Sequence, residues 1–292
     1  MTSHTSRLRA TSTVTAVATA LVLGAAPAAV AQSPPVTVRA PSPSPDPFKG
    51  QTADQIADKA VTATQSATSL RMAGRVVSSD QPLDVDFSLN DKNECTGAIK
   101  LKGGAAEIRQ TGRVTYMKGD EAFWRASMSA QRMPEAQIDA TIELLKGRWL
   151  KIPQGQPGAE DLSDVCDLKA LLDDLGKDKE RRTGLTRGPD AEVDDTPVAT
   201  LVKKKTDADT TEPGDTAEPR DPGDPTEPRD TPETTTVSVS QRGKPYILKV
   251  VKTGGDEPGS VTLSEYDKPV KVAVPPAGET VDLTKLDRGT PA

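Results

Sequence analysis

A regular alternation of apolar and polar residues between Leu83 and Leu101 constrains the fold more than any other part of the sequence. In the stretch LDVDFSLNDKNECTGAIKL, every second residue before the central NDKNE is apolar, and the alternation returns in Ile99-Lys100-Leu101. Successive side chains of a β-strand point to opposite faces, so the pattern predicts a hairpin of two strands that share one apolar face. That face either packs in a closed core or borders a space for an apolar ligand.

Residues 1–31 have the three parts of a secretory signal peptide. Arg7 and Arg9 form its basic end, an apolar run covers residues 14–24, and Ala29-Val30-Ala31 supplies the small residues for cleavage before Gln32. The run is shorter than the about 20 apolar residues that span a bilayer, although a retained anchor helix remains the alternative. No cysteine stands at the cleavage point, so we expect a protein secreted or released into the extracytoplasmic cell envelope without a lipid anchor.

Cysteine and histidine are scarce in this chain. Cys95 and Cys166 are the only cysteines, and in an exported protein an even number favours a disulfide, with two free buried thiols as the alternative. His4, in the leader, is the only histidine, so the cleaved chain lacks the histidine of a Ser-His-Asp, Cys-His or His-ligated metal site. We therefore predict no catalytic residues, no metal and no cofactor, and the sequence gives no support for an enzyme.

Two segments are poor in residues that could form a core. Residues 32–50 are rich in Pro and Ser and predict a linker. Residues 206–236 hold ten acidic residues, two arginines and six prolines, which predicts a disordered acidic Pro/Thr-rich insert. This insert carries a net charge of −8 while the whole chain carries −6, so the acidity says little about what the folded part binds. A solvated spacer and a recognition motif both fit the insert.

Residues 51–205 and 237–288 are enough for a single domain, in which we predict three helices. The first has capping-box spacing between Thr52 and Gln55 and ends by Gly74. The second begins at Pro134 and ends at Gly147, and the third covers residues 161–176 and carries Cys166. The predicted inward residues are Ile56, Ala60, Ala63, Ala67 and Leu70 in the first helix, Ile138, Ile142 and Leu145 in the second, and Val165, Leu168, Leu172 and Leu175 in the third.

The other patterned segments predict strands. In AAEIRQTGRVTYMKGDEAFWRA, short strands would be separated by Gly112 and by Gly119-Asp120, and RWLKIP would add a short extended segment. Further strands are predicted in PVATLVKKK, TTVSVSQRGKPYILKVVKTG and GSVTLSEYDKPVKVAVPP, so the insert would replace a turn between two neighbouring strands. Phe123 and Trp124 would follow the turn at Gly119-Asp120, either as an exposed membrane-touching tip or packed against the sheet.

Three stretches resemble the LppX/LprAFG-like (LolA-like) family of actinobacterial envelope lipoproteins and lipid carriers: ADKAVTATQSATSLRMAGRV, RQTGRVTYMKGDEAFWR, and GKPYILKVVKTG followed by LSEYDKPVKVAVPPAGETVDL. The resemblance covers residues 51–286 apart from the insert. It implies an α+β fold, a strongly curved antiparallel half-barrel sheet with helices packed on its concave face. It also implies an apolar cavity between sheet and helices that holds acyl chains. The sequence departs from many relatives because its leader lacks the lipidated cysteine.

On this resemblance we expect an exported cell-envelope protein that binds a lipid or another acylated molecule non-covalently. Its partners would be this apolar ligand and, transiently, a membrane surface, with the protein a monomer that does not bind nucleic acid. The alternative is an envelope sensor or assembly module of the same fold, with a closed core and no ligand. The residues predicted to line the cavity are Leu83, Val85, Phe87, Ile99, Leu101, Ile108, Val114, Ile138 and Ile142.

Overall fold

The computed structural model describes residues 46–78, 81–101, 103–155, 165–177, 179, 182–205, 232–255 and 257–286. The predicted signal peptide, the linker up to residue 45 and residues 206–231 of the acidic insert lie outside this range. The chain divides into two compact units, Met1–Pro45 and Asp46–Ala292, and every described residue belongs to the second.

The second unit begins with a helix and a run of strands: α1 (Ala53–Gln65), β1 (Ser69–Ser78), β2 (Gln81–Asn90), β3 (Cys95–Leu101), β4 (Gly104–Thr111) and β5 (Val114–Gly119). Helices dominate the middle: α2 (Glu121–Ala130), α3 (Glu135–Leu145), the strand β6 (Trp149–Pro153) and α5 (Leu168–Lys177). The last part is again mainly strands: β7 (Thr186–Arg187), β8 (Ala191–Val193), β9 (Thr196–Lys205), β10 (Glu233–Ser240), β11 (Ile247–Thr253), β12 (Gly259–Ser264), a 3₁₀ turn (Ala277–Glu279), β13 (Thr280–Asp282) and α6 (Leu283–Leu286).

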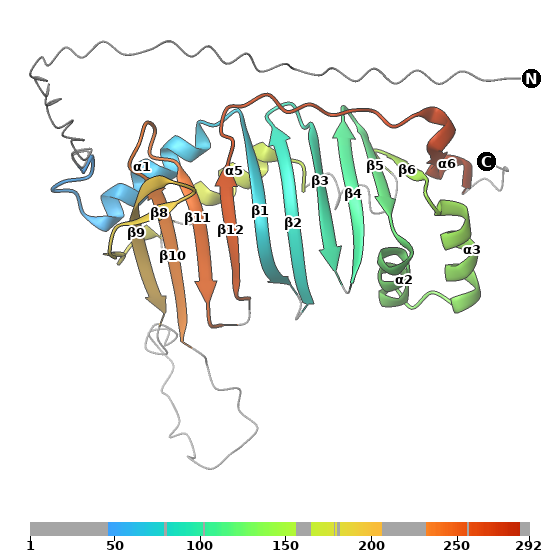
Figure 1. The fold of residues 1–292 in the computed structure, drawn as a ribbon, viewed down its shortest axis with the longest axis horizontal. Helices are drawn as coiled ribbons and strands as arrows, with labels where there is room; N and C mark the ends of the chain where they lie inside the picture. Colours follow the sequence, from blue (N-terminus) through green and yellow to red (C-terminus); the bar gives the residue numbers. More distant parts are fainter. Residues whose placement is uncertain are drawn as a thin grey trace, which may run out of the picture. The chain divides into compact units, whose positions relative to one another are not determined.

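The described strands form one sheet of 13 strands in the order β13-β6-β5-β4-β3-β2-β1-β12-β11-β10-β9-β7, with β8 paired to β9 (Figure 1). Neighbours are antiparallel, apart from the parallel pair of β13 and β6. The order runs from one edge strand to another and does not close on itself. A large, curved, open sheet with helices confirms the predicted α+β fold class.

The first helix is shorter than its apolar spacing predicts. Its capping box is present: Thr52 Oγ1 accepts from the backbone N–H of Gln55 at 3.2 Å, and Gln55 Oε1 accepts from the Thr52 N–H at 3.0 Å. The helix ends at Gln65, and Leu70 lies in strand β1. Apolar residues continue at helical spacing past this point, but Ser and Thr around them favour the end of a helix over its interior.

Residues 121–130 form helix α2, so the strand predicted to carry Phe123 and Trp124 is wrong. Asp120 is the N-cap residue, and its Oδ1 accepts from the backbone N–H of Phe123 at 2.7 Å. Its Oδ2 accepts from the backbone N–H of Ala105 at 2.9 Å, which joins the cap to β4. Gly119-Asp120 is therefore a helix start and not a turn between two strands.

Of the third predicted helix, residues 161–164 lie outside the described range, and residues 165–167 are not helical. Cys166 lies in the turn before α5, and Asp167 Oδ1 caps the helix by accepting from the backbone N–H of Ala170 at 2.9 Å. Val165, predicted to face inward, is 41% exposed because it precedes the helix. By contrast, α3 follows Pro134 and buries Ile138, Ile142 and Leu145 as predicted.

Residues 265–276 form no strand, against the strand predicted in KPVKVAVPP. The segment passes across one end of the strands toward α6 (Figure 1). Its three prolines have no N–H to donate to a sheet, which explains the error. The start of the segment is held by Asp267, whose Oδ2 accepts from Tyr246 Oη at 2.6 Å and whose Oδ1 accepts from the Thr68 N–H at 2.9 Å.

The structure includes the last residues of the predicted linker and the strands on either side of the predicted insert. Phe48 is buried and Asp46 Oδ2 lies 2.8 Å from Arg187 Nη2, so residues 46–50 pack with the domain. Lys205 of β9 pairs with Glu233 of β10, so residues 206–232 connect two neighbouring strands. Among the helices of the described ranges, none has the length and apolar character needed to cross a membrane.

Candidate ligand-binding face

Helices α1, α2 and α5 pack on one face of the sheet, which we call the inner face. Two glycines show this for α2: a Cβ atom on Gly104 would collide with the backbone nitrogen of Phe123, and one on Gly119 would lie 2.9 Å from Trp124 Nε1. Cross-strand pairing then assigns every second residue of the neighbouring strands to the same face. The opposite side is called the outer face.

One part of the inner face, the covered part, is fully buried. Leu70, Phe87, Leu89 and Cys95 of strands β1 to β3 are each at most 1% exposed. They share one core cluster with residues of α1 and α5, which lie behind the sheet in Figure 1. The two helices are joined by Gln65 Nε2, which donates to the backbone carbonyl of α5 at 3.1 Å. This part of the apolar face is ordinary protein core.

A second part of the inner face is only half-buried, and we call it the open apolar face. Its members are aliphatic, pack against the core cluster and retain exposed surface: Val85, Ile99, Leu101, Val237, Val250 and Val261. Cross-strand pairs join these residues into a row. Val237 pairs with Val250, and Val250 pairs with Val261. Val261 pairs with Gly74 of β1, and the row continues from Gly74 to Val85 and Ile99. The row crosses six strands, which is about 24 Å for the five spacings of about 4.8 Å between them.

The nine residues predicted to line a cavity therefore fall into three groups. Phe87, Ile108, Ile138 and Ile142 are at most 6% exposed, packed by other protein side chains. Val85, Ile99 and Leu101 belong to the open apolar face, and Leu83 is half-buried beside Leu101. Val114 is the exception, because alternation along β5 places it on the outer face, opposite to Met117. Its neighbour Gly112 turns the chain, and the turn shifts which residues face inward.

Half of the open apolar face comes from the last third of the chain. Val237, Val250 and Val261 lie on β10, β11 and β12 and were not among the predicted site residues. Alternation in TTVSVSQ, ILKVV and SVTLS carries the necessary signal. What the sequence does not show is that β12 pairs with β1, which joins these valines to the first hairpin.

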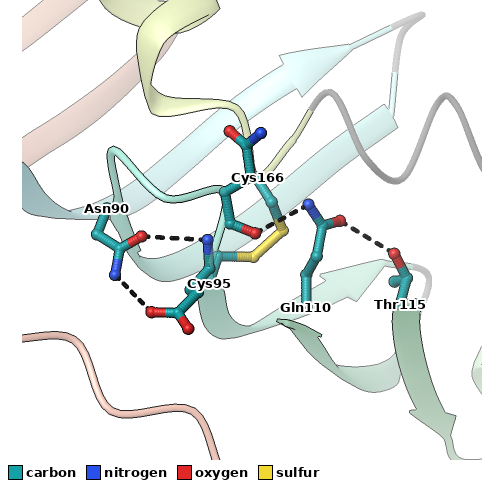
Figure 2. Close-up of a disulfide and its surroundings, with 7 residues drawn as sticks. Asn90, Cys95, Gln110, Thr115 and Cys166 are labelled. Atoms are coloured by element: carbon teal, nitrogen blue, oxygen red, sulfur yellow. Dashed lines mark hydrogen bonds between the residues drawn. A yellow bond between two sulfur atoms is a disulfide. The ribbon is translucent and has the colours of Figure 1, made fainter. Parts of the chain in front are cut away.

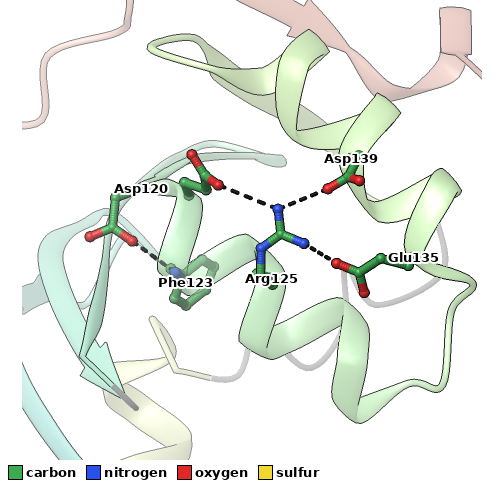
Figure 3. Close-up of polar contacts among 6 residues, drawn as sticks. Asp120, Phe123, Arg125, Glu135 and Asp139 are labelled. Carbon is green, nitrogen blue, oxygen red and sulfur yellow. Dashed lines mark hydrogen bonds and ion pairs between the residues drawn. The ribbon is translucent and has the colours of Figure 1, made fainter.

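The α2 end of the inner face is filled by aromatic side chains. Phe123 and Trp124 are 4% and 8% exposed, with ring centroids 5.3 Å apart in an edge-to-face arrangement. Neither forms an exposed membrane-touching tip. Outside them, Arg125 holds α2 to α3 through Glu135 and through Asp139 at 2.8 Å, with Glu121 at 3.3 Å (Figure 3).

The opposite end of the inner face carries lysines. Lys203 of β9 and Lys252 of β11 both pair with Thr235 of β10, in register just beyond the valines. Lys252 Nζ lies 3.2 Å from a carboxylate oxygen of Glu233. Along β9, β10 and β11, the inner face thus becomes polar toward the strand ends that flank the insert.

The outer face is polar where the inner face is apolar. Arg71 donates two hydrogen bonds to Asp86, at 2.8 and 2.6 Å, and Arg75 donates two to Asp84, at 2.5 and 2.8 Å. The hydrogen bonds from Arg71 lower the pKa of Asp86 below its usual value. These cross-strand pairs explain the aspartates that alternate with apolar residues in LDVDF.

Cys95 and Cys166 form the predicted disulfide, with their Cα atoms 5.5 Å apart and both residues fully buried (Figure 2). Beside it, Gln110 Nε2 donates to the Asn93 carbonyl at 3.2 Å and accepts through Oε1 from Thr115 Oγ1 at 3.0 Å. The bond joins the turn before α5 to β3, so it fixes the covered part of the inner face.

Two of the hollows among the described residues have volumes of about 200 Å³ each, and neither of these two lies on the open apolar face. One adjoins the Gln110–Thr115 hydrogen bond and is lined mainly by polar residues: Asn93, Gln110, Gly112, Arg113, Thr115, Ile152 and Gln154. The other lies between the sheet and the segment after β12: Leu70, Ser88, Thr96, Glu265, Lys268, Pro269, Val270 and Lys271. Within the described ranges, no group of three or more His, Cys, Asp or Glu side chains is placed to hold a metal ion.

No protein-family model matches this sequence, and no curated protein is similar to it in sequence. Among solved structures, LprF from Mycobacterium bovis is 16% identical, with 76% of this chain and 96% of that chain covered and a TM-score of 0.47. The lipoprotein LppX from Mycobacterium tuberculosis is 15% identical, with coverages of 76% and 98% and a TM-score of 0.41. A structure of the Pseudomonas aeruginosa MucA/MucB complex gives 10% identity, coverages of 77% and 59% and a TM-score of 0.28. The structures similar to this chain thus include LprF and LppX.

Proposed function

We propose that this protein is an exported cell-envelope protein that binds the acyl chain of a lipid or acylated molecule, non-covalently, on the open apolar face. The observation that carries the proposal is the row of half-buried aliphatic side chains on five strands, which passes β1 at Gly74. Contiguous apolar surface of this kind is uncommon on a soluble protein unless something binds there.

The physical chemistry of the face suits a hydrocarbon chain. Removing apolar surface from water contributes about 25 cal/mol per Å², so an acyl chain laid along the row gains affinity in proportion to its length. The face presents no charged side chain between Val237 and Ile99 that would have to be desolvated. Binding requires no reactive group, which fits a chain whose mature part has no histidine.

Export is supported by the predicted leader and by the disulfide. A bond between two fully buried cysteines is the type of cross-link that forms in oxidising compartments. We propose that the protein acts as a monomer there and touches a membrane surface only transiently, while it takes up or releases its ligand.

Two neighbouring valines on β11 provide a matched test. Val250 belongs to the open apolar face, whereas Val251 is also half-buried but faces the outer side. Titration with the fluorescent fatty acid cis-parinaric acid should give saturable binding to the unaltered chain. Val250→Ser should weaken it about fivefold, because half-burying a valine contributes on the order of 1 kcal/mol. Val251→Ser should leave it unchanged, and equal effects of the two substitutions would contradict the proposed site.

The second candidate is an envelope sensor or assembly module of the same fold that holds no lipid. It is favoured by the burial of Phe87, Ile108, Ile138 and Ile142, which shows that much of the predicted lining is closed core. In this case the open apolar face would receive an apolar protein segment. Protein isolated from its native envelope would then contain no extractable lipid and would not bind cis-parinaric acid.

A further inference from the structure

Trp124 carries a buried hydrogen-bond donor that the fold does not use. The residue is 8% exposed, and its Nε1 is enclosed and has no hydrogen-bond partner among the described residues. Tryptophan has one polar atom, and it usually finds a partner when the ring is buried. A buried donor without one is destabilising, so its presence in a closely packed site calls for an explanation.

The position of this nitrogen connects it to the open apolar face. Trp124 Nε1 lies against Gly119, which pairs with Ala106, and Ala106 pairs with Ile99. Along this row the side chains shrink from Ile99 to Ala106 to Gly119, and the rings of α2 occupy the space that remains. The indole of Trp124 therefore borders the open apolar face at its α2 end.

We propose that the acyl ligand carries an oxygen acceptor, a carboxylate or ester carbonyl, at the end that meets α2, and that Trp124 Nε1–H donates a hydrogen bond to it. This inference rests on the proposed function and names the ligand class. Because the nitrogen is enclosed, binding turns the indole toward the open apolar face. The hydrogen bond then distinguishes fatty acids and acyl esters from plain hydrocarbon.

The chain offers an internal reference, because Trp149 is its only other tryptophan. Leu150 pairs with Met117 on the inner face, so Trp149 faces outward. There the Arg109 guanidinium lies 4.3 Å from the centroid of its ring. A ligand on the open apolar face does not reach Trp149.

The test uses ¹⁵N-labelled full-length protein, in which two indole N–H signals are expected. Addition of dodecanoate or its methyl ester should shift the Trp124 signal and leave the Trp149 signal in place, whereas dodecane, which has no acceptor, should bind without the downfield shift of a new hydrogen bond. Trp124→Phe keeps an aromatic ring and removes the donor. It should weaken dodecanoate binding about tenfold and dodecane binding little, while Trp149→Phe changes neither.

The outcomes separate this inference from the proposed function. If dodecanoate binds and the Trp124 signal does not move, or if Trp124→Phe weakens dodecanoate and dodecane equally, the hydrogen bond is refuted and the apolar site stands. If neither dodecanoate nor dodecane binds the unaltered protein, the proposed function itself is refuted. The measurement on the unaltered protein decides the matter even where Trp124→Phe does not fold.

Discussion

The covered part of the inner face and the open apolar face are built from the same strands with the same alternation, yet only one of them is closed. On β2, Phe87 and Leu89 are fully buried, whereas Val85, two residues before Phe87, is half-buried. The difference arises from the helices and not from the strands. A period of two shows which side of a strand is apolar, but not what lies on that side.

Simple dimensions explain why the described helices cover only part of the sheet. Strands β1 and β2 have ten residues each and are about 33 Å long, whereas a helix is about 10 Å wide. A helix layer crossing the strands therefore covers about a third of their length. The four longest described helices have 10 to 13 residues, too few to cover the rest of a sheet this wide.

The largest effect should come from the disulfide, which holds the covered part. Replacing both Cys95 and Cys166 by alanine should lower the free energy of unfolding by about 4 kcal/mol, the loop-closure value for their separation of 71 residues. Urea denaturation measures this value. A loss below about 1 kcal/mol would show that the covered part does not depend on the bond.

A matched pair of leucines tests the comparison directly. Leu89→Ala, in the covered part, should cost about 3 kcal/mol because a cavity remains in closed core. Leu101→Ala, on the open apolar face, should cost about 1 kcal/mol because solvent or ligand occupies the space. Fatty-acid affinity should show the reverse order, falling for Leu101→Ala and not for Leu89→Ala.

Disturbing the contact between α2 and the sheet should lower the free energy of unfolding by an intermediate amount. Gly104→Ala places a methyl group against the backbone of Phe123, so α2 must shift at a cost of about 2 kcal/mol. Gly278→Ala is the control, since no atom lies within 4 Å of its added Cβ. Thermal unfolding of the two variants should differ, and equal melting temperatures would place α2 away from β4.

The smallest change in stability is expected for Asp267, whose hydrogen bonds hold the start of the segment after β12 against Thr68 and Tyr246. Hydrogen bonds, first from Tyr246 and then from the Thr68 backbone, lower the pKa of Asp267 to about 2. A lowered pKa in the folded state stabilises the protein above the unfolded value of 3.8, and this stabilisation is lost as pH falls from there through about 2. Because the carboxylate is partly exposed, Asp267→Asn should lower the free energy of unfolding by only about 1 kcal/mol at neutral pH.

The pH dependence provides the control for this substitution. The difference in free energy of unfolding between Asp267→Asn and the unaltered protein should be fully present above pH 5 and should fall to a small fraction of that value at pH 2. Asparagine tolerates the positive φ of 58° at this position, so backbone strain does not add to the effect. A difference at pH 2 as large as the one at neutral pH would mean that charge is not its cause.

Much of the fold was predictable because its signals are local. The alternation in residues 83–101, the capping box at Thr52 and the helix after Pro134 each depend on neighbours in sequence, and the structure contains all three. The failures at Asp120 and Asp167 share one cause: each aspartate caps a helix. In the sequence, the aspartate after Gly119 is also typical of a turn, and the aspartate after Cys166 is also compatible with the interior of a helix.

The candidate site was predictable only in part, because burial depends on distant segments. Phe87 and Val85 have the same pattern, and only the position of the covering helices distinguishes them. Val114 was assigned to the wrong face because a turn at Gly112 resets the alternation. The valines of β10 to β12 join the site through the pairing of β12 with β1, which links residues almost 200 positions apart.

Native mass spectrometry of the protein isolated from its native envelope tests the central claim most directly. We predict a population heavier than the polypeptide by the mass of one acylated molecule, released by organic solvent and restored by adding fatty acid. A spectrum that contains only the polypeptide, and that does not change after incubation with fatty acid, would contradict a ligand site on the open apolar face.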